Sequence, residues 1–234
     1  MRFNIQGNRV IDLSQTLEPG VPRPVGFPDP SLDFLRTISG GDVINVEKFT
    51  ISPHSGTHID APFHFFEGKD TIEKIPPECI IGPAVVVDLR DKKGSVPIER
   101  EDVEQWELKT GEHIREGDAV LLMTDFSKLW KLGKEGEPFL TSGWPYISRS
   151  VADYFVSKKV RLVGVESMDL DLIDPFDLST SEFIGHRTFL SNNIYIIENL
   201  TNLDRIGATR CSIVGTPLKL RGGTGSPVRV VAIV

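Results

Sequence analysis

Three of the five histidines in this 234-residue chain fall within one short segment, together with an aspartate. The four residues are His54, His58, Asp60 and His64. Imidazole and carboxylate are ligands that divalent transition metals prefer, and a catalytic site needs about three protein ligands with one position left open for water. His54, His58 and Asp60 can supply those ligands, which leaves His64 free to move protons.

The local sequence predicts how these side chains are positioned. A proline and a glycine flank His54, so we expect this residue at a turn. An extended segment from Thr57 to Asp60 then follows. Because successive side chains of a strand point to opposite faces, His58 and Asp60 lie on the same face. A proline ends the strand just beyond, which keeps His64 near the resulting cavity.

Length and composition limit the class of protein. A hydrophobic content of 39% over 234 residues is enough for one sizeable core, so we expect a single domain spanning 1–234. The net charge of −7 argues against a nucleic-acid partner. No apolar run approaches the ~18 residues of a membrane span, and Met1 to Gln6 lacks the apolar stretch of a secretory signal. We therefore expect a cytoplasmic protein with no membrane partner.

Short apolar runs rich in β-branched residues recur along the chain and predict strands. These runs are 44–51, 84–89, 119–123, 160–165, 194–197, 211–214 and 228–234. Helices are predicted at 97–108, after a capping-box pattern that starts at Ser150, and at 179–191 after a second such pattern. The alternation predicts an α/β fold in which strands outnumber helices, with a barrel or sandwich and the helices outside.

Two loops have unusual compositions. Five prolines between Pro19 and Pro30 predict a stiff, extended loop over 18–31 that can shape the mouth of a pocket. A later stretch contains several acids but lacks the glycine and the closing glutamate of a calcium-binding loop. We interpret it as a solvated loop with helix caps. Its acids are Glu166, Asp169, Asp171, Asp174 and Asp177.

The histidine segment also resembles a known family signature. The string His54-x-Gly56-Thr57-His58-x-Asp60-Ala61-Pro62-x-His64-Phe65 is similar to that of the cyclase-like metal-dependent hydrolases, which include bacterial kynurenine formamidase and isatin hydrolase. Formamidases of this family carry a further histidine and, twelve residues later, a glutamate. His186 and Glu198 have this spacing here. The fold implied by the resemblance is a swivelling β/β/α domain, in agreement with the strand-rich alternation.

The resemblance implies roles for these residues. One metal would be bound by His54, His58 and Asp60, a second by Asp60, His186 and Glu198, and His64 would be the catalytic proton donor and acceptor. The two ions are expected to be divalent, with zinc favoured and manganese as the alternative. The implied activity is arylformamidase-like hydrolysis of a small-molecule amide in tryptophan catabolism, by a homo-oligomer that is a dimer or a tetramer.

One departure from the family leaves the substrate open. Kynurenine formamidases carry a tryptophan in the proline-rich loop that contacts the aromatic substrate, and this loop has none. Either Phe27 takes that place as a substrate contact, or Arg23 selects an anionic substrate. Two further functions remain as alternatives. One is ring opening of a cyclic amide such as isatin, and the other is a non-catalytic module that binds a metal or a small molecule.

Overall fold

The computed structural model of the protein describes residue 7 and residues 9–234, so the segment Met1 to Gln6 considered above lies outside the described residues. The strands are β1 Val10–Asp12, β2 Ser31–Arg36, β3 Val46–Thr50, β4 His58–Asp60, β5 Ile81–Asp88, β6 Pro97–Ile98, β7 Ala119–Met123, β8 Tyr146–Ile147, β9 Leu162–Val165, β10 Tyr195–Glu198, β11 Arg210–Pro217 and β12 Gly225–Ile233. The α-helices are α1 Arg100–Thr110, α2 Glu137–Thr141, α3 Arg149–Ser157 and α4 Ile184–Ser191. Within the described ranges, no helix combines the length and the apolar character needed to cross a membrane.

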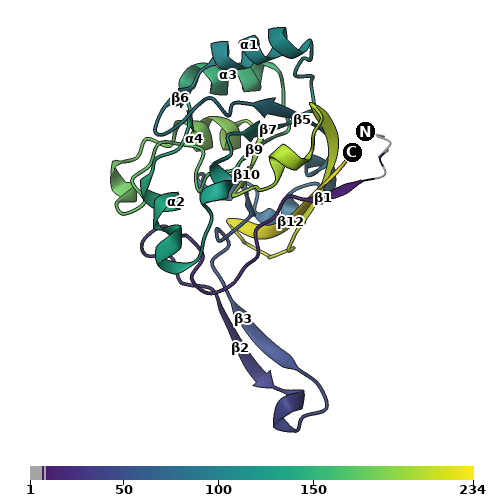
Figure 1. Ribbon diagram of the computed structural model, residues 1–234, viewed down its shortest axis with the longest axis vertical. Coiled ribbons are helices and arrows are strands. Elements are labelled where there is room, and N and C mark those ends of the chain that lie inside the picture. Colours follow the sequence, from purple (N-terminus) through teal and green to yellow (C-terminus); the bar gives the residue numbers. More distant parts are fainter. Residues whose placement is uncertain (1–6, 8) are drawn as a thin grey trace.

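Eight strands form one sheet that closes on itself. Their order is β1-β12-β11-β5-β7-β9-β10-β4, and β4 also pairs with β12. Strands β5, β7, β9 and β10 run parallel, whereas the remaining neighbours in the sheet pair antiparallel. Figure 1 shows helices α1, α3 and α4 gathered on one side of the parallel strands. This arrangement confirms the predicted α/β architecture with helices outside a strand-rich sheet.

Apart from Asp88 and Glu198 at the carboxyl ends of β5 and β10, the parallel strands are largely apolar because both of their faces are buried. In β5, Ala84 and Val86 join the core enclosed by the sheet, while Val85 and Val87 join the core beneath the helices. The same alternation divides β7 between the two cores. The runs of β-branched residues in the sequence therefore mark the strands correctly.

Helices α1 and α3 begin at other residues than the sequence predicts. Helix α1 starts at Arg100 because Pro97–Ile98 forms a short parallel pair with Tyr146–Ile147. Helix α3 is capped by Ser148, whose hydroxyl accepts a hydrogen bond from Val151 N. The capping-box interpretation of Ser150 was wrong. Ser150 lies in the first turn of α3, and its hydroxyl donates to Glu99 at the start of α1.

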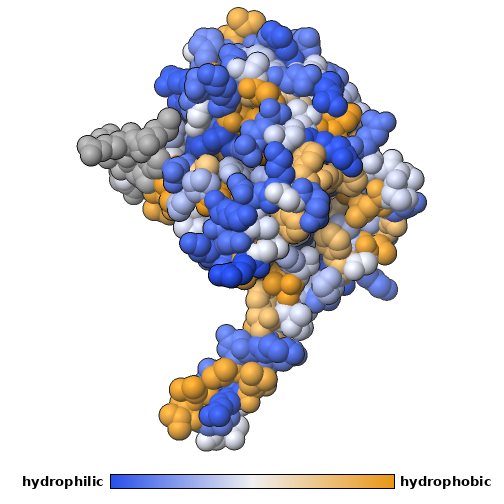
Figure 2. All heavy atoms as spheres, turned by 180° about the vertical axis from the view of Figure 1, so that it is seen from behind, coloured by the Kyte–Doolittle hydropathy of each residue, from blue (hydrophilic) through white to orange (hydrophobic). Residues whose placement is uncertain are grey.

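Strands β2 and β3 form an arm that projects from the body of the protein (Figure 1). The run 44–51 predicts β3, but the pairing strand β2 was not expected. The two strands pair antiparallel, with Leu32 opposite Phe49. Figure 2 shows apolar side chains on the surface of this arm. Its exposed large hydrophobic residues are Leu32, Phe34, Leu35, Ile38, Val43, Ile44 and Phe49.

Candidate metal centre

Four elements from distant parts of the chain bring five of the predicted side chains together. Strand β4 carries His58 and Asp60, and its neighbour β10 carries Glu198 directly opposite His58. Helix α4 contributes His186, and the turn before β4 contributes His54. The predicted turn, the extended segment and the shared face of His58 and Asp60 all match the structure. All five residues converge on one buried point.

The two carboxylates lie among the three imidazole rings. Asp60 Oδ1 is 2.8 Å from His54 Nδ1 and 3.5 Å from His58 Nε2, while Asp60 Oδ2 is 3.2 Å from His186 Nε2. Glu198 faces the same rings, with Oε2 3.4 Å from His58 Nε2 and Oε1 3.5 Å from His186 Nε2. His54, His58 and Asp60 form one group that could hold a metal ion, and Asp60, His186 and Glu198 form another.

The hydrogen bonds of the rings show which nitrogens carry lone pairs. His58 Nδ1 lies 2.9 Å from the carbonyl oxygen of Gly56, and a carbonyl can only accept, so Nδ1 must donate. When the ring is neutral, Nε2 is unprotonated and faces both carboxylates. Neither oxygen of Asp60 accepts a hydrogen bond of normal geometry from the described residues, although both are buried. Nitrogen lone pairs and carboxylate lone pairs that face each other at these distances repel, and a cation bound between them would remove that repulsion.

Strand β12 holds His54 close to the cluster. Gly225 lies opposite Asp60 in the β12–β4 pairing. A Cβ at this position would lie 2.8 Å from His54 Cε1 and 2.7 Å from the carbonyl oxygen of Ile59, so only glycine allows this approach. The adjacent Thr224 places its hydroxyl 2.9 Å from His54 Nε2. The ring is therefore held with Nδ1 directed at Asp60.

Without a metal, the cluster attracts protons. Burial raises the pKa of Glu198 to about 8. Burial alone would lower the pKa of His186, but the surrounding carboxylates of Asp169, Asp171 and Asp60 outweigh it and raise that pKa well above 6.5. Burial also opposes ionisation of Asp60, yet the neighbouring histidines keep its pKa well below the ordinary value. A site that gathers positive charge in this way suits a divalent cation.

His64 lies beside the cluster without entering either group of candidate ligands. Its ring stacks on that of His54 at a centroid distance of 3.9 Å. Burial lowers the pKa of His64 from 6.5 to about 3, so its imidazole is neutral near pH 7. A free imidazole with an ordinary pKa would be partly charged at that pH. In this environment, the ring must accept a proton before it can donate one.

The acid-rich stretch is largely buried, which corrects its interpretation as a solvated loop. Asp169 and Asp171 lie against His186, at 3.6 Å and 2.9 Å from its Nδ1. Glu166 accepts hydrogen bonds from Thr124 N and Asp125 N and so fixes the loop after β7. The cap interpretation holds at the exposed end of the stretch for Asp177, which accepts a hydrogen bond from Ser179 N and caps the short 3-10 helix Leu178–Thr180. Asp174 accepts a hydrogen bond from Phe176 N in a turn and caps no helix.

Helix α4 begins five residues later than the capping-box pattern predicts. It runs from Ile184 to Ser191, and its N-cap residue Phe183 makes no side-chain hydrogen bond. The capping acceptor is instead Asp171, which receives hydrogen bonds from Gly185 N and His186 N. This acceptor comes from a distant segment, so no local pattern in the sequence could have identified it.

A small cavity of about 130 Å³ opens beside the candidate ligands. Its remaining walls are mainly apolar and aromatic, formed by Pro24, Phe27, His64, Phe65, Met168, Asp169, Ile173, Leu178 and Phe183. The proline-rich loop therefore shapes this cavity, as expected. Arg23 does not line it. Its guanidinium instead pairs with Asp29 at 3.0 Å and donates to the carbonyl oxygen of Phe27.

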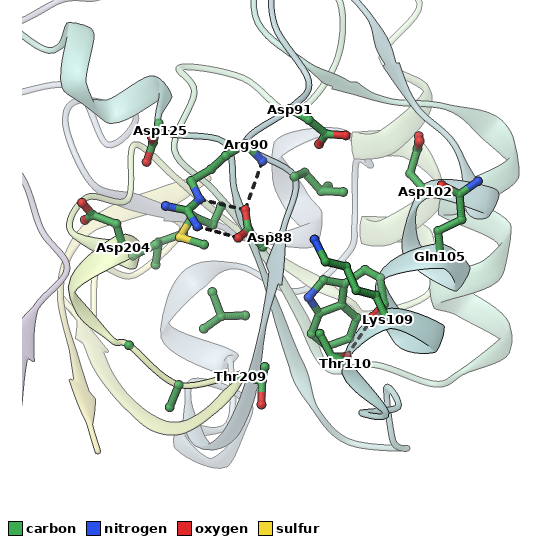
Figure 3. A pocket seen from close by; sticks show the side chains of 17 residues that line it. Asp88, Arg90, Asp91, Asp102, Gln105, Lys109, Thr110, Asp125, Asp204 and Thr209 are labelled. Carbon is green, nitrogen blue, oxygen red and sulfur yellow. Dashed lines mark hydrogen bonds and ion pairs between the residues drawn. The ribbon is translucent and has the colours of Figure 1, made fainter.

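A larger cavity of about 830 Å³ lies between α1, the end of β5 and the loop before β11. Figure 3 shows that charged side chains border it and that Arg90 forms two hydrogen bonds to Asp88, at 2.8 and 2.7 Å. None of the groups of candidate metal ligands among the described residues includes a side chain of this cavity. The candidate metal ligands therefore lie at the smaller cavity of about 130 Å³.

Comparisons with known proteins agree with this geometry. The Cyclase family model matches residues 11–172. The kynurenine formamidase of Bacillus thuringiensis (strain Al Hakam) is 32% identical over 223 residues, which cover 94% of this chain and 95% of the relative. The kynurenine formamidase of Erythrobacter litoralis (strain HTCC2594) is 30% identical, with coverages of 95% and 93%.

Solved structures show the same relationship. Isatin hydrolase A from Ralstonia solanacearum superposes on this chain with a TM-score of 0.83 at 28% identity. The superposition covers 97% of this chain and 92% of the isatin hydrolase chain. A structure described as a potential metal-dependent hydrolase with cyclase activity gives a TM-score of 0.73 at 28% identity, with coverages of 96% and 96%. The chain therefore belongs to the Cyclase family and is a metal-dependent hydrolase of amide bonds other than peptide bonds.

Proposed function

We propose that this chain is an arylformamidase-like enzyme that holds two divalent cations. His54, His58 and Asp60 would bind one ion, and Asp60, His186 and Glu198 the other. The observation that carries the proposal is the position of Asp60, whose two oxygens face different histidines and belong to both groups. A carboxylate that contributes to both groups can bridge two ions. Imidazole and carboxylate ligands favour zinc, with manganese as the alternative.

The bound cations would acidify water and polarise the substrate carbonyl. The chain's own contribution to proton transfer comes from His64. Because burial keeps this ring neutral, one of its nitrogens can accept the proton released by the attacking water and pass it to the leaving nitrogen. The stacked ring of His54 holds it in place. Aromatic and apolar walls exclude bulk water from this transfer.

The walls of the cavity favour a flat aromatic ring in the part of the substrate that lies beside the candidate ligands. Phe27, Phe65 and Phe183 supply aromatic walls, and none of the lining residues is lysine or arginine. Phe27 is therefore the substrate contact that we propose in place of the family's tryptophan. Since Arg23 already pairs with Asp29, selection of an anionic substrate by Arg23 has no support in this arrangement. An aryl formamide fits these walls better than a substrate that requires a cationic partner.

The relatives suggest two reactions for such a site. The name kynurenine formamidase indicates a formamide substrate, and the name isatin hydrolase indicates a cyclic amide substrate. The complete second group, with His186 and Glu198, favours the formamidase reaction on this chain. A non-catalytic binding module is not supported, because these relatives are enzymes. We place the reaction in tryptophan catabolism in the cytoplasm.

We also propose that the protein is a homo-oligomer in which the β2–β3 arm contacts a second copy of the chain. An isolated two-stranded ribbon is marginally stable in water, and this one exposes large apolar side chains such as Phe34 and Val43. The arm also carries charges of both signs, so it is electrostatically suited to a copy of itself. Two-fold dimers are the most common such assemblies.

The substrate proposal is tested with protein purified without chelator. We expect about two divalent ions per chain by elemental analysis and faster hydrolysis of N-formyl arylamines than of isatin, compared as kcat/KM. Two ions with isatin as the better substrate would replace the formamidase proposal with ring opening. A single ion per chain would contradict the second metal group.

Two variants separate metal binding from proton transfer. Asp60→Asn is expected to lose bound metal together with activity, because an amide oxygen is a much weaker ligand than a bridging carboxylate. His64→Asn is expected to retain both ions and to lower kcat about 100-fold or more, since a general acid–base residue contributes about this much. Elemental analysis and kinetics on the same samples check both. Wild-type turnover in His64→Asn would remove that residue from the mechanism.

Titration of the metal-free protein tests the environment of His64. The pKa falls from 6.5 to about 3, so the folded protein binds fewer protons than the unfolded chain between these pH values. His64 therefore contributes a loss of stability as the pH falls below about 6.5. Histidine NMR spectra, assigned by comparison with His64→Asn, should show no protonation of His64 between pH 7 and 5. A midpoint near 6.5 would contradict the burial of this ring.

The arm proposal is tested by light scattering after size-exclusion chromatography. The wild-type protein is expected to run at a multiple of its 26.0 kDa chain mass. The double substitution of Leu35 and Val43 by glutamate should reduce it to a monomer. Leu108→Glu is the matched control, because Leu108 is 82% exposed on α1, outside the arm. A monomeric wild type, or an unchanged arm variant, would rule out this interface.

A further inference from the structure

The segment around Asp169–Asp171 lies directly behind the second group of candidate ligands. Leu170 N donates a 3.0 Å hydrogen bond to Glu198 Oε1. Asp171, which is 2% exposed, places Oδ2 2.9 Å from His186 Nδ1. One short segment therefore contacts both His186 and Glu198.

Both carboxylate oxygens of Asp171 are used. Oδ1 accepts a hydrogen bond from Gly185 N at 2.5 Å, and Oδ2 accepts one from His186 N at 3.0 Å in addition to the contact with the ring. Asp169, Asp171 and His186 also lie close enough to form a third candidate metal group. However, an oxygen that accepts two N–H donors is poorly available to an ion. Asp171 is thus better suited to hold His186 than to bind a metal.

The contact with Asp171 determines which nitrogen of His186 is protonated. A carboxylate within 2.9 Å of Nδ1 favours the ring form with its proton on that nitrogen. Nε2 then carries the lone pair, and Nε2 is the nitrogen that faces Asp60 Oδ2 and Glu198 Oε1. Proton and lone pair are therefore arranged as a metal ligand requires.

The orientation of the ring is fixed as well. Phe65 stacks on His186 at a centroid distance of 4.7 Å, and Phe183 meets it edge-on at 5.8 Å. The neighbouring position must be glycine, because a Cβ on Gly185 would overlap Leu170 Cδ1 and come within 3.0 Å of Asp171 Oδ1. This close approach brings the first turn of α4 onto the Asp171 carboxylate.

The segment that carries Asp171 is itself anchored to the body of the protein. Trp144 Nε1 donates to the carbonyl oxygen of Asp171 at 3.0 Å, and Ile147 N donates to that of Leu170 at 2.8 Å. Trp144 is buried. Hydrogen bonds from Trp144, just before β8, and from Ile147 in β8 thus fix the backbone that carries the Asp171 carboxylate.

We propose that Asp171 is a positioning residue for the second metal ion: it caps α4 and holds His186 with its proton on Nδ1 and its lone pair directed at the ion. The inference rests on the proposed function, in which His186 is a ligand of that ion. It assigns a role to an acid that the sequence pattern places in a solvated loop. The role is exerted through His186, without contact between Asp171 and substrate.

The test compares Asp171→Asn with Asp174→Asn, both in the full-length protein. Asn at 171 keeps one acceptor oxygen for an amide of α4 but removes the charge that fixes the proton of His186. Asp174 is the matched control because it lies in the same loop and its carboxylate accepts, among the residues that the structure describes, only the backbone hydrogen bond of Phe176 N. Two measurements are made: zinc dissociation constants by chelator competition, and the protonated nitrogen of His186 by ¹⁵N NMR of the metal-free protein at a pH high enough for this ring to be neutral.

We expect the second zinc ion to bind about 10- to 100-fold more weakly to Asp171→Asn. We also expect its His186 signal to move away from the Nδ1-protonated form, while Asp174→Asn matches the wild type. An Asp171→Asn variant with wild-type zinc affinity and an unchanged ring form would overturn the inference. If the wild type itself binds no second zinc ion, the proposed function fails, and the NMR comparison then decides the role of Asp171 by itself. Amide signals of α4 verify that the helix remains folded in both variants.

Discussion

The buried carboxylate of Asp60 is the constraint on which the rest of the site depends. Burial of an ionised carboxylate is costly unless positive charge lies next to it, and ordinary hydrogen bonds to this group are absent among the described residues. When their rings are neutral, His58 and His186 instead direct unprotonated nitrogens at it. In His58, the carbonyl oxygen of Gly56 accepts a hydrogen bond from Nδ1, which leaves Nε2 to face Asp60. In His186, the carboxylate of Asp171 holds Nδ1 in the same way. Each ring is oriented by a partner that lies outside the site.

The same edge of the sheet supports several parts of the site. Parallel strands place their carboxyl ends together, and in open α/β sheets such an edge commonly binds ligands. Here β9 ends just before Glu166, and β10 ends at Glu198. Glu166 fixes the loop that follows β7, whereas Glu198 faces the histidines. Two buried glutamates at the carboxyl ends of neighbouring strands thus serve different purposes, one holding backbone and the other facing the candidate metal positions.

Residue spacing in the sequence predicted the part of the site whose residues lie close together along the chain. The turn at His54 and the shared face of His58 and Asp60 follow from residue spacing alone, as do the buried parallel strands. The contribution of His186 and Glu198 depended on a family resemblance, because only the folded chain brings α4 and β10 to β4. The start of α4 was placed wrongly for the same reason. Its cap is Asp171, a residue that no pattern adjacent to the helix could reveal.

The three-residue strand β4 has a consequence for the order in which the protein folds. It pairs with β10 along one edge and with β12 along the other, so it closes the ring of strands with residues from the last quarter of the chain. Contacts between such distant segments form only after a large loss of chain entropy. The ligand cluster is therefore complete only when these distant segments have paired. A cation bound to all of its ligands would stabilise the closed ring of strands.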